Sequence, residues 1–377
     1  MSCRPAPLFV PLVLLLLLPL SANSLPAAEP PPPPPPLPSA ANDERLWGPG
    51  SDRRALLRSI DESLRTLGTA AAARAYARQQ AATGVTRDRV RRSLVRLRGL
   101  VRNCKTAAEM DAKLRREFVA YEPGGAEPVH FTGYFEPLYA ASRVRTAAYR
   151  WPLYRPVTTG RPRVELEGRD GVPPPGSPLR GRELIYLKDR TEAFLVQVQG
   201  SARLRLPDGR VVRVHNAGTN GQPYTSVGRQ LVLDGKIAED ALTLPAVLEW
   251  FRAHPEDVSE YLSRNRRFVF FTIARDTGSP PTGSTGARLI AERSIATDKR
   301  LQPPGAPALI RFDLVNPAAA AAWGRPAVTR LVLDQDAGSA IRGPARVDLF
   351  VGSGPAAGLR AGVVNSAGRL CYLLLRE

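Results

Sequence analysis

The chain has 377 residues, 43% of them hydrophobic, so it is long enough for two domains with well-buried cores. This composition is that of a globular protein and excludes a chain without a packed core, although 37 residues are proline. Its net charge is +18, and only five of its 53 basic residues are Lys. The charge either reflects a bias towards Arg codons or attracts an anionic partner, such as nucleic acid, a membrane surface or a carboxylate-bearing polymer.

The amino terminus has the pattern of an export signal. Leu8–Leu20 is almost wholly apolar, but it is shorter than the roughly 20 residues that a membrane-spanning helix needs. Small residues at Ala22 and Ser24 allow cleavage after Ser24. We expect a signal peptide at 1–24 and a periplasmic protein, which argues against a nucleic-acid partner. No Cys follows the apolar run, so we find no lipoprotein signal, and association with the outer membrane stays open.

Cysteine and histidine are scarce and form no metal-binding pattern. Cys104 and Cys371 remain after the predicted signal, and the sequence agrees equally with a disulfide and with two buried thiols. The three histidines are scattered along the chain, and no Cys-x-x-Cys spacing occurs. We therefore expect neither a metal nor an organic cofactor.

The amino-terminal third contains a linker followed by helices. Seven consecutive prolines, Pro30–Pro36, predict an extended segment without a core, so we expect a Pro-rich linker at 25–46 and a folded part that begins near Trp47. Ser51 and Asp52 are suitable caps for a first amphipathic helix, whose apolar residues are Leu56, Leu57, Ile60, Leu64 and Leu67.

A second amphipathic helix is strongly basic. Its apolar positions are Val90, Leu94, Leu97 and Val101. Five arginines are interleaved with them: Arg89, Arg91, Arg92, Arg96 and Arg98. They form either an ordinary solvated face or a surface that meets an anionic polymer.

Strand patterns dominate from residue 130 onward. Phe194, Val196 and Val198 alternate with polar residues and predict a strand. The segment 203–214 predicts a hairpin around Pro207-Asp208-Gly209, and 268–273 predicts a strand after a helical stretch at 243–264. Four further short strands are expected at 308–314, 330–333, 346–351 and 369–375. Turns rich in Gly and Pro separate them, which indicates a barrel or a sandwich.

An acid in the middle of the third of these strands is unusual. Asp348 alternates with the apolar Val347 and Leu349, and Asp336 stands twelve residues earlier, before a turn. A carboxyl group that faces a cavity loses hydration, and a neighbouring carboxylate repels its charge, so its pKa rises and it can act as a general acid. The pattern also fits an aspartate bonded to turn amides. We find neither a nucleophile elbow nor a phosphate-binding glycine loop.

The chain resembles the membrane-bound lytic murein transglycosylase A family, whose carboxyl-terminal module is named for three aspartates. The matching segments run in order over about 50–377: Phe131–Pro137, Gln197–Ser201, Asn220–Gly228, Asn265–Phe271, Ser294–Asp298 and Asp336–Ile341, followed by Asp348.

The resemblance implies a mainly β fold with helices, in which a smaller β-domain interrupts a double-psi β-barrel and a groove lies between them. The barrel would comprise 47–136 with 284–377, and the insert 137–283. Asp298, Asp336 and Asp348 match the three aspartates. By position, Asp348 would be the catalytic acid, with Asp336 and Thr132 beside it in the groove.

The implied activity is that of a peptidoglycan lytic exotransglycosylase, although the sequence does not distinguish exo- from endo-action. Such an enzyme cleaves the β-1,4 bond between N-acetylmuramic acid and N-acetylglucosamine and leaves 1,6-anhydromuramyl ends. The candidates for substrate binding, besides Asp298, are Tyr134, Phe135, Tyr139, Tyr224, Gln199 and Asn220. We expect a monomer that acts on peptidoglycan strands and has no nucleic-acid partner, and we leave partners in wall-remodelling complexes open.

Two alternatives stay open. In an inverting glycoside hydrolase, Asp336 would activate water at a carboxyl separation of roughly 6.5–9.5 Å. In a peptidoglycan-binding protein without activity, Asp348 would be structural.

Overall fold

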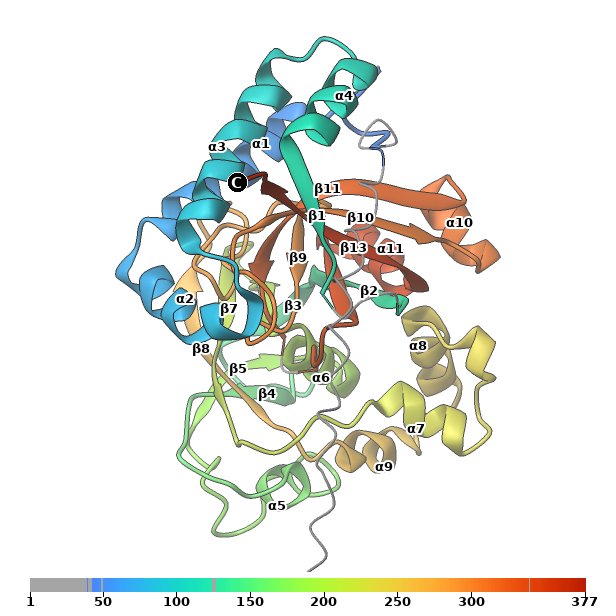
Figure 1. The fold of residues 1–377 in the computed structure, drawn as a ribbon. Coiled ribbons are helices and arrows are strands. Elements are labelled where there is room, and N and C mark those ends of the chain that lie inside the picture. Colours follow the sequence, from blue (N-terminus) through green and yellow to red (C-terminus); the bar gives the residue numbers. More distant parts are fainter. Residues whose placement is uncertain (1–38, 40–42, 49, 124–126, 339) are drawn as a thin grey trace, which may run out of the picture. The chain divides into compact units, whose positions relative to one another are not determined.

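The computed structural model describes residues 39, 43–48, 50–123, 127–338 and 340–377 (Figure 1). The predicted signal peptide at 1–24 and most of the predicted linker at 25–46 lie outside the described residues. Within the described part, no helix is both long enough and apolar enough to span a bilayer.

Within the described residues, four helices precede the first strand: α1 (Arg53–Leu67), α2 (Ala70–Thr83), α3 (Arg87–Asn103) and α4 (Ala107–Glu117). The two predicted amphipathic helices are α1 and α3, which lie side by side (Figure 1). Their apolar faces are buried, with Leu56, Ile60, Leu94 and Leu97 at most 1% exposed. Helices α2 and α4 were not predicted from the sequence. Thr69, Thr86 and Thr106 cap α2, α3 and α4 by accepting a backbone N–H.

The predicted barrel is confirmed. One sheet has the strand order β1-β13-β10-β11-β9-β12-β2, and β2 also pairs with β13, which closes six strands into a barrel and leaves β1 attached outside. The strands are β1 (Phe118–Tyr121), β2 (Val129–Glu136), β9 (Ser294–Ala296), β10 (Pro307–Asp313), β11 (Ala327–Asp336), β12 (Arg346–Ser353) and β13 (Asn365–Leu375). Cys104 and Cys371 are buried free thiols in this core.

A second sheet has the strand order β4-β5-β3-β6-β7-β8 and its own apolar core. Its strands are β3 (Leu138–Ser142), β4 (Trp151–Tyr154), β5 (Glu183–Leu187), β6 (Ser201–Arg205), β7 (Val211–Thr219) and β8 (Val269–Arg275). The predicted hairpin is β6–β7. Every strand of this sheet falls between β2 and β9 in the chain, as an insert at 137–283 would require. The domain boundaries themselves stay a prediction.

The strand predicted at 194–198 is wrong, because these residues belong to helix α6 (Arg190–Gln199). The Asp189 side chain accepts the backbone N–H groups of Thr191 and Glu192 and so starts the helix. Gly200 ends it in the left-handed conformation, with φ 78°. The apparent alternation hid consecutive buried residues, since Ala193 and Leu195 are buried as well.

The remaining helices flank the two sheets. They are α5 (Arg163–Glu167), α7 (Val227–Leu233), the 3₁₀ turn Glu239–Ala241, α8 (Leu244–Ala253), α9 (Val258–Arg264), α10 (Pro317–Trp323) and α11 (Pro355–Gly362). The helical stretch predicted at 243–264 is confirmed as α8 and α9. Helix α11 packs so closely on β2 that a Cβ at Gly133 would lie 2.8 Å from the backbone of Ala361. Glycine is therefore required at that position of β2.

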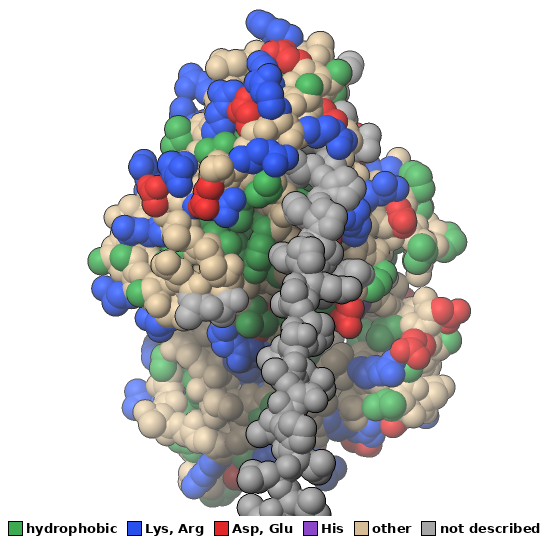
Figure 2. Space-filling view, viewed as in Figure 1, with side chains coloured by type: hydrophobic (Ala, Val, Ile, Leu, Met, Phe, Trp, Pro, Cys, Tyr) green, Lys and Arg blue, Asp and Glu red, His purple; other side chains and the backbone are tan. Residues whose placement is uncertain are grey.

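The arginines of α3 form a solvated face rather than an unpaired cationic surface. Arg91 and Arg92 pair with Asp88, Arg96 with Glu117, and Arg98 with Asp61. Figure 2 likewise shows acidic side chains among the basic ones on the visible face. Of the two interpretations of this helix, the structure favours the solvated face.

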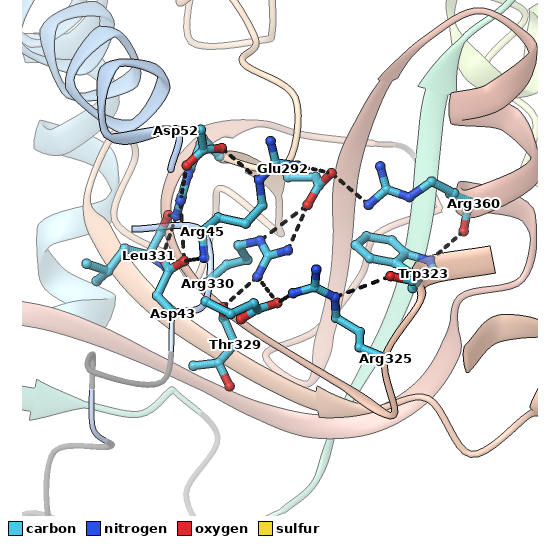
Figure 3. A network of polar contacts seen from close by, with 12 residues as sticks. Asp43, Arg45, Asp52, Glu292, Trp323, Arg325, Thr329, Arg330, Leu331 and Arg360 are labelled. Carbon is cyan, nitrogen blue, oxygen red and sulfur yellow. Dashed lines mark hydrogen bonds and ion pairs between the residues drawn. The ribbon is translucent and has the colours of Figure 1, made fainter. Parts of the chain in front are cut away.

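A network of buried ion pairs fixes the start of the folded part (Figure 3). Asp43 and Arg293 are both fully buried and pair at 2.5 Å. Glu292 binds Arg330 at 2.9 Å and Arg360 at 2.7 Å. The folded part therefore begins by Asp43, four residues before the predicted start at Trp47. The charge of Arg293 explains this difference, since a buried guanidinium requires a carboxylate partner.

Candidate active site

The two aspartates singled out in the sequence lie in one row across the barrel sheet. Asp336 of β11 and Asp348 of β12 are both register partners of Ala296 on the short strand β9 between them. Asp348 is in turn the register partner of Thr132 on β2. Paired residues of a sheet point to the same face, so the row brings Asp336, Asp348 and Thr132 to one face of the barrel.

Alternation along β12 explains how a strand accommodates an acid. Val347 and Leu349 are fully buried in the barrel core, whereas the Asp348 side chain between them is 21% exposed. On the neighbouring β2, Phe131 faces the core in the same way, and Thr132 faces the side of Asp348. The acid therefore stands on the outer surface of the barrel wall.

Asp348 is held through one of its two oxygens. The hydroxyl of Thr132 donates a hydrogen bond to Oδ1, and Nη2 of Arg346 lies 3.4 Å from the same atom. Among the described residues, no hydrogen bond to Oδ2 is present. Burial raises the pKa of Asp348 to about 6; Arg346 lowers it and the charge of Asp336 raises it. This carboxyl group can therefore exchange a proton near neutral pH through Oδ2.

Asp336 is the more firmly bonded of the two acids. Its Oδ2 accepts a hydrogen bond from the Tyr134 hydroxyl at 2.8 Å. Its Oδ1 accepts the backbone N–H groups of Ser284 and Ala337, each at 2.8 Å. Burial raises the pKa of Asp336, while these three donors lower it by stabilising the carboxylate. Its position provides a negative charge near Asp348.

Arg346 is a site residue that the sequence analysis missed. It shares the face of Asp348 because it is two residues away on the same strand, and this spacing was the available signal. Its Nη2 donates to Thr132 Oγ1 at 2.9 Å, and its Nη1 donates to Nδ1 of His130 at 2.8 Å. Since a guanidinium only donates, Nδ1 of His130 is the acceptor, and Nε2 donates to Asn365 at 2.6 Å. Hydrogen bonds to Thr132 and to His130 thus hold the Arg346 guanidinium in place.

A cavity of about 480 Å³ lies in front of Asp348 and is lined from both sheets. The barrel contributes Thr132, Tyr134, Arg346 and Asp348 to its wall. The other wall comes from the inserted segment. It includes Arg163, Gln199, Tyr224, Asn265 and Arg267. A second cavity of about 310 Å³ shares Thr132, Gln199, Tyr224 and Arg346 with the first. The two cavities therefore adjoin each other, and we call them together the groove.

Four of the predicted substrate-binding residues meet at this groove. Tyr134 and Tyr224 line the cavity of Asp348, and Phe135 lines the second cavity. Gln199 lines both, and its Oε1 accepts the backbone N–H of Phe135 at 3.1 Å, which ties α6 to β2. Tyr139 packs against the core of the second sheet. It is not among the residues that line either cavity.

Asn220 and Asp298 have structural contacts that argue against the predicted substrate binding. The Asn220 amide donates to the carbonyls of Arg161 and Arg266, and its oxygen accepts from two backbone N–H groups. All four of its hydrogen-bonding positions are thus used. Asp298 binds Arg300 and accepts the N–H of Gly343 at 3.1 Å. Arg300 lowers the pKa of Asp298 to about 2. Asp298 fixes the loop between β11 and β12.

Metal ligands are not grouped in the described part of the chain. There, no set of three or more His, Cys, Asp or Glu side chains is arranged to hold an ion. The geometry of the described side chains offers proton exchange at Asp348, next to the hydroxyl of Thr132 and the charged groups of Asp336 and Arg346.

Comparison with known proteins gives matches along most of the chain. The family described as "MltA specific insert domain" matches residues 130–159 and 156–272, and the "3D domain" family matches 293–374. Membrane-bound lytic murein transglycosylase A of Escherichia coli K12 is 30% identical over 301 residues, which are 76% of this chain and 80% of that protein.

Solved structures agree with these matches. E. coli MltA with bound chitohexaose superposes with a TM-score of 0.69 at 25% identity, covering 86% of this chain and 90% of that one. A membrane-bound lytic murein transglycosylase from Agrobacterium tumefaciens gives 0.63 at 27% identity, with 78% and 85% covered.

The closed barrel, the inserted sheet and a groove carboxyl group whose pKa burial raises to about 6 suit an enzyme that uses acid–base chemistry. The family is now equally clear. The chain belongs to the membrane-bound lytic murein transglycosylase A family.

Proposed function

We propose that this protein cleaves peptidoglycan strands between N-acetylmuramic acid and N-acetylglucosamine and leaves 1,6-anhydromuramyl ends. It is a lytic transglycosylase by family. One observation carries the assignment of the chemistry to particular residues. Asp348 faces the groove with its pKa raised to about 6, bonded to Thr132 through Oδ1 only.

The first step uses Asp348 as an acid. Its protonated Oδ2 gives a proton to the glycosidic oxygen as the bond from that oxygen to C1 of the muramyl residue breaks. Positive charge develops at C1 in an oxocarbenium-like state. Thr132 and Arg346 hold Oδ1 and stabilise the carboxylate that forms.

The second step uses the same group as a base. The Asp348 carboxylate takes the proton of the muramyl C6 hydroxyl, and the C6 oxygen attacks C1 to close the anhydro ring. The proton returns to Asp348, no water is consumed, and the enzyme is ready for another cycle. Because the nucleophile belongs to the substrate, one acid–base group is sufficient, and the reaction gains from proximity.

Asp336 has an electrostatic role in this proposal. Burial raises the pKa of Asp336, and three hydrogen-bond donors oppose this effect by stabilising its ionised form. Its negative charge then raises the pKa of Asp348 and stabilises the positive charge at C1.

The cell envelope is the setting that the family name suggests, and we propose a periplasmic enzyme that acts as a monomer on glycan strands. Export through a signal peptide at 1–24, association with the outer membrane and partners in wall-remodelling complexes belong to the same proposal.

Digestion of purified sacculi followed by mass spectrometry tests the reaction. Anhydro-ended muropeptides, lighter by one water than hydrolytic fragments, are expected. Fragments with reducing ends would instead indicate the inverting hydrolase, and bound sacculi without soluble fragments would indicate a binding protein. The family membership favours neither alternative.

A further inference from the structure

The cavity in front of Asp348 has an unbalanced set of charges. Three arginines and one carboxylate line it, namely Arg163, Arg267, Arg346 and Asp348. Arg163 pairs with Glu167 at 2.9 Å, and Arg346 lies 3.4 Å from Asp348. Arg267 forms no ion pair with any residue that the structure describes. One cation of this cavity thus lacks a counter-charge.

The Arg267 side chain is partly buried, and its guanidinium makes few hydrogen bonds. Its Nε is buried without a hydrogen-bond partner among the described residues, and the contact of its Nη1 with the Gln222 carbonyl is long, at 3.4 Å. Burial lowers the pKa of Arg267, and the charge of Arg342 in the loop between β11 and β12 lowers it further. An anion at this place would satisfy both the free donor positions and the charge.

Two hydrogen bonds fix the main chain of Arg267. The N–H of Arg267 donates to Asn265 Oδ1 at 3.2 Å, and its carbonyl accepts from Arg163 at 2.8 Å. The residue is therefore positioned before any ligand arrives, which reduces the entropy lost on binding.

We propose that Arg267 binds a carboxylate of the peptide attached to the muramyl residue while that residue lies at Asp348. The inference rests on the proposed function, because it requires a muramyl residue at the acid. Carboxylate is the favoured ligand class, since the planar guanidinium pairs with its two oxygens at once. Arg267 lies in the loop between α9 and β8, whereas Asp348 lies on the barrel strand β12, so a substrate with a peptide would be held by both walls of the groove.

The test compares two substrates with each enzyme. Glycan strands that carry stem peptides and strands from which an amidase has removed them are digested, and anhydro ends are counted by mass spectrometry. For Arg267→Gln, the ratio of kcat/KM on peptide-bearing strands to that on bare strands should fall roughly 10- to 100-fold. Arg267→Lys keeps the charge but loses the paired donors, so its ratio should fall by less.

The neighbouring Arg266 provides a matched control. It is exposed and is not among the residues that line the cavity, and in the described part of the chain its side chain donates only to Gln222, at 3.2 Å. Arg266→Gln should keep the wild-type ratio. Peptide-bearing strands with chemically amidated carboxylates should behave like bare strands with the wild-type enzyme, which identifies the carboxylate as the group recognised.

The possible failures are distinguishable. A wild-type enzyme that makes no anhydro ends on either substrate would refute the proposed function. Normal wild-type activity with an unchanged ratio in folded Arg267→Gln and Arg267→Lys would overturn the role of Arg267 alone. An equal loss on both substrates would also overturn it, because Arg267 would then act on the glycan or on the acid.

Discussion

Thr132 and Asp348 are register partners on the parallel strands β2 and β12, and the hydroxyl of Thr132 donates to Oδ1 of Asp348. The neighbouring register pairs along these two strands also interact. His130 accepts a hydrogen bond from Arg346, and the rings of Tyr134 and Phe350 lie 5.3 Å apart. The acid is thus positioned by three consecutive cross-strand pairs on one face.

Asp348→Asn should abolish most activity. The amide keeps the shape of the side chain but cannot give and take a proton, so we expect kcat to fall by roughly 10²–10⁴-fold. The measurement is the rate of release of anhydro muropeptides from sacculi, with circular dichroism to verify folding. Full activity of the folded variant would remove Asp348 from the mechanism.

The pH profile should show a loss of activity as pH rises through about 6, because the acid must be protonated and its pKa is about 6. In Asp336→Asn the repelling charge is gone, so the pKa of Asp348 falls and the loss should move to lower pH. Rates of sacculus digestion between pH 4 and 8 give both curves. If the pH at which activity is lost is the same in Asp336→Asn as in the wild type, the two acids are not coupled.

Thr132→Val should move the loss of activity to higher pH. Without the hydroxyl donor the carboxylate is less stable, so the pKa of Asp348 rises. The rate should also fall roughly 10- to 100-fold, the effect of losing a hydrogen bond to a charged group. Thr132→Ser keeps the hydroxyl and should stay close to the wild type. If the valine and serine variants behave alike, the hydroxyl has no such role.

Asp348→Asn should also stabilise the fold above pH 6. The folded-state pKa of Asp348 is raised, so its contribution to stability is complete below the unfolded-state value of 3.8 and is lost as pH rises to about 6. Asn cannot ionise, so above pH 6 the free energy of unfolding of the variant should exceed that of the wild type by about 3 kcal/mol or less. Urea unfolding at pH 4 and pH 8 should show a difference between variant and wild type only at the higher pH. Equal stabilisation at both would exclude ionisation as its cause.

Asp43→Ala should destabilise the protein strongly. It leaves the fully buried Arg293 with Asp52 as its one remaining carboxylate among the described residues. We expect a loss of about 3–5 kcal/mol in the free energy of unfolding, as for a broken buried ion pair. Glu249→Ala, which breaks an exposed pair with Arg252, is the control and should have no measurable effect. Equal melting of the two variants would contradict the role of the buried network.

Much of the barrel and of its acid could be predicted from the sequence. Alternation of Val347, Asp348 and Leu349 was enough to place the acid on the outer face of a strand, because a strand has a fixed period. The hairpin β6–β7 was recognisable from its turn residues. The predicted strand at 194–198 was wrong, because a buried helix with apolar residues on several sides has no clear period, and the cap Asp189 was not used as a signal.

The partners of the predicted site residues could not be derived from sequence spacing. Asn220 and Tyr224 are close in the chain, yet Asn220 is fully bonded to backbone groups and Tyr224 lines the groove. Arg267, in the loop before β8, and Asp348, on β12, line one cavity, which only the tertiary fold reveals. Burial and hydrogen-bond partners decide these roles, and both depend on distant segments.

The closed barrel has a consequence for the order of folding. In the described part of the chain, strand β2 pairs with β12 and β13, which follow much later in the sequence. Thr132 and Asp348, which meet at the site, are 216 positions apart. Contacts between segments this far apart form late, because the long intervening chain must first be ordered. A chain that lacks 348–377 therefore lacks Asp348 itself and strand β13, which closes the barrel against β2. A complete groove therefore requires that β12 and β13 have paired with β2.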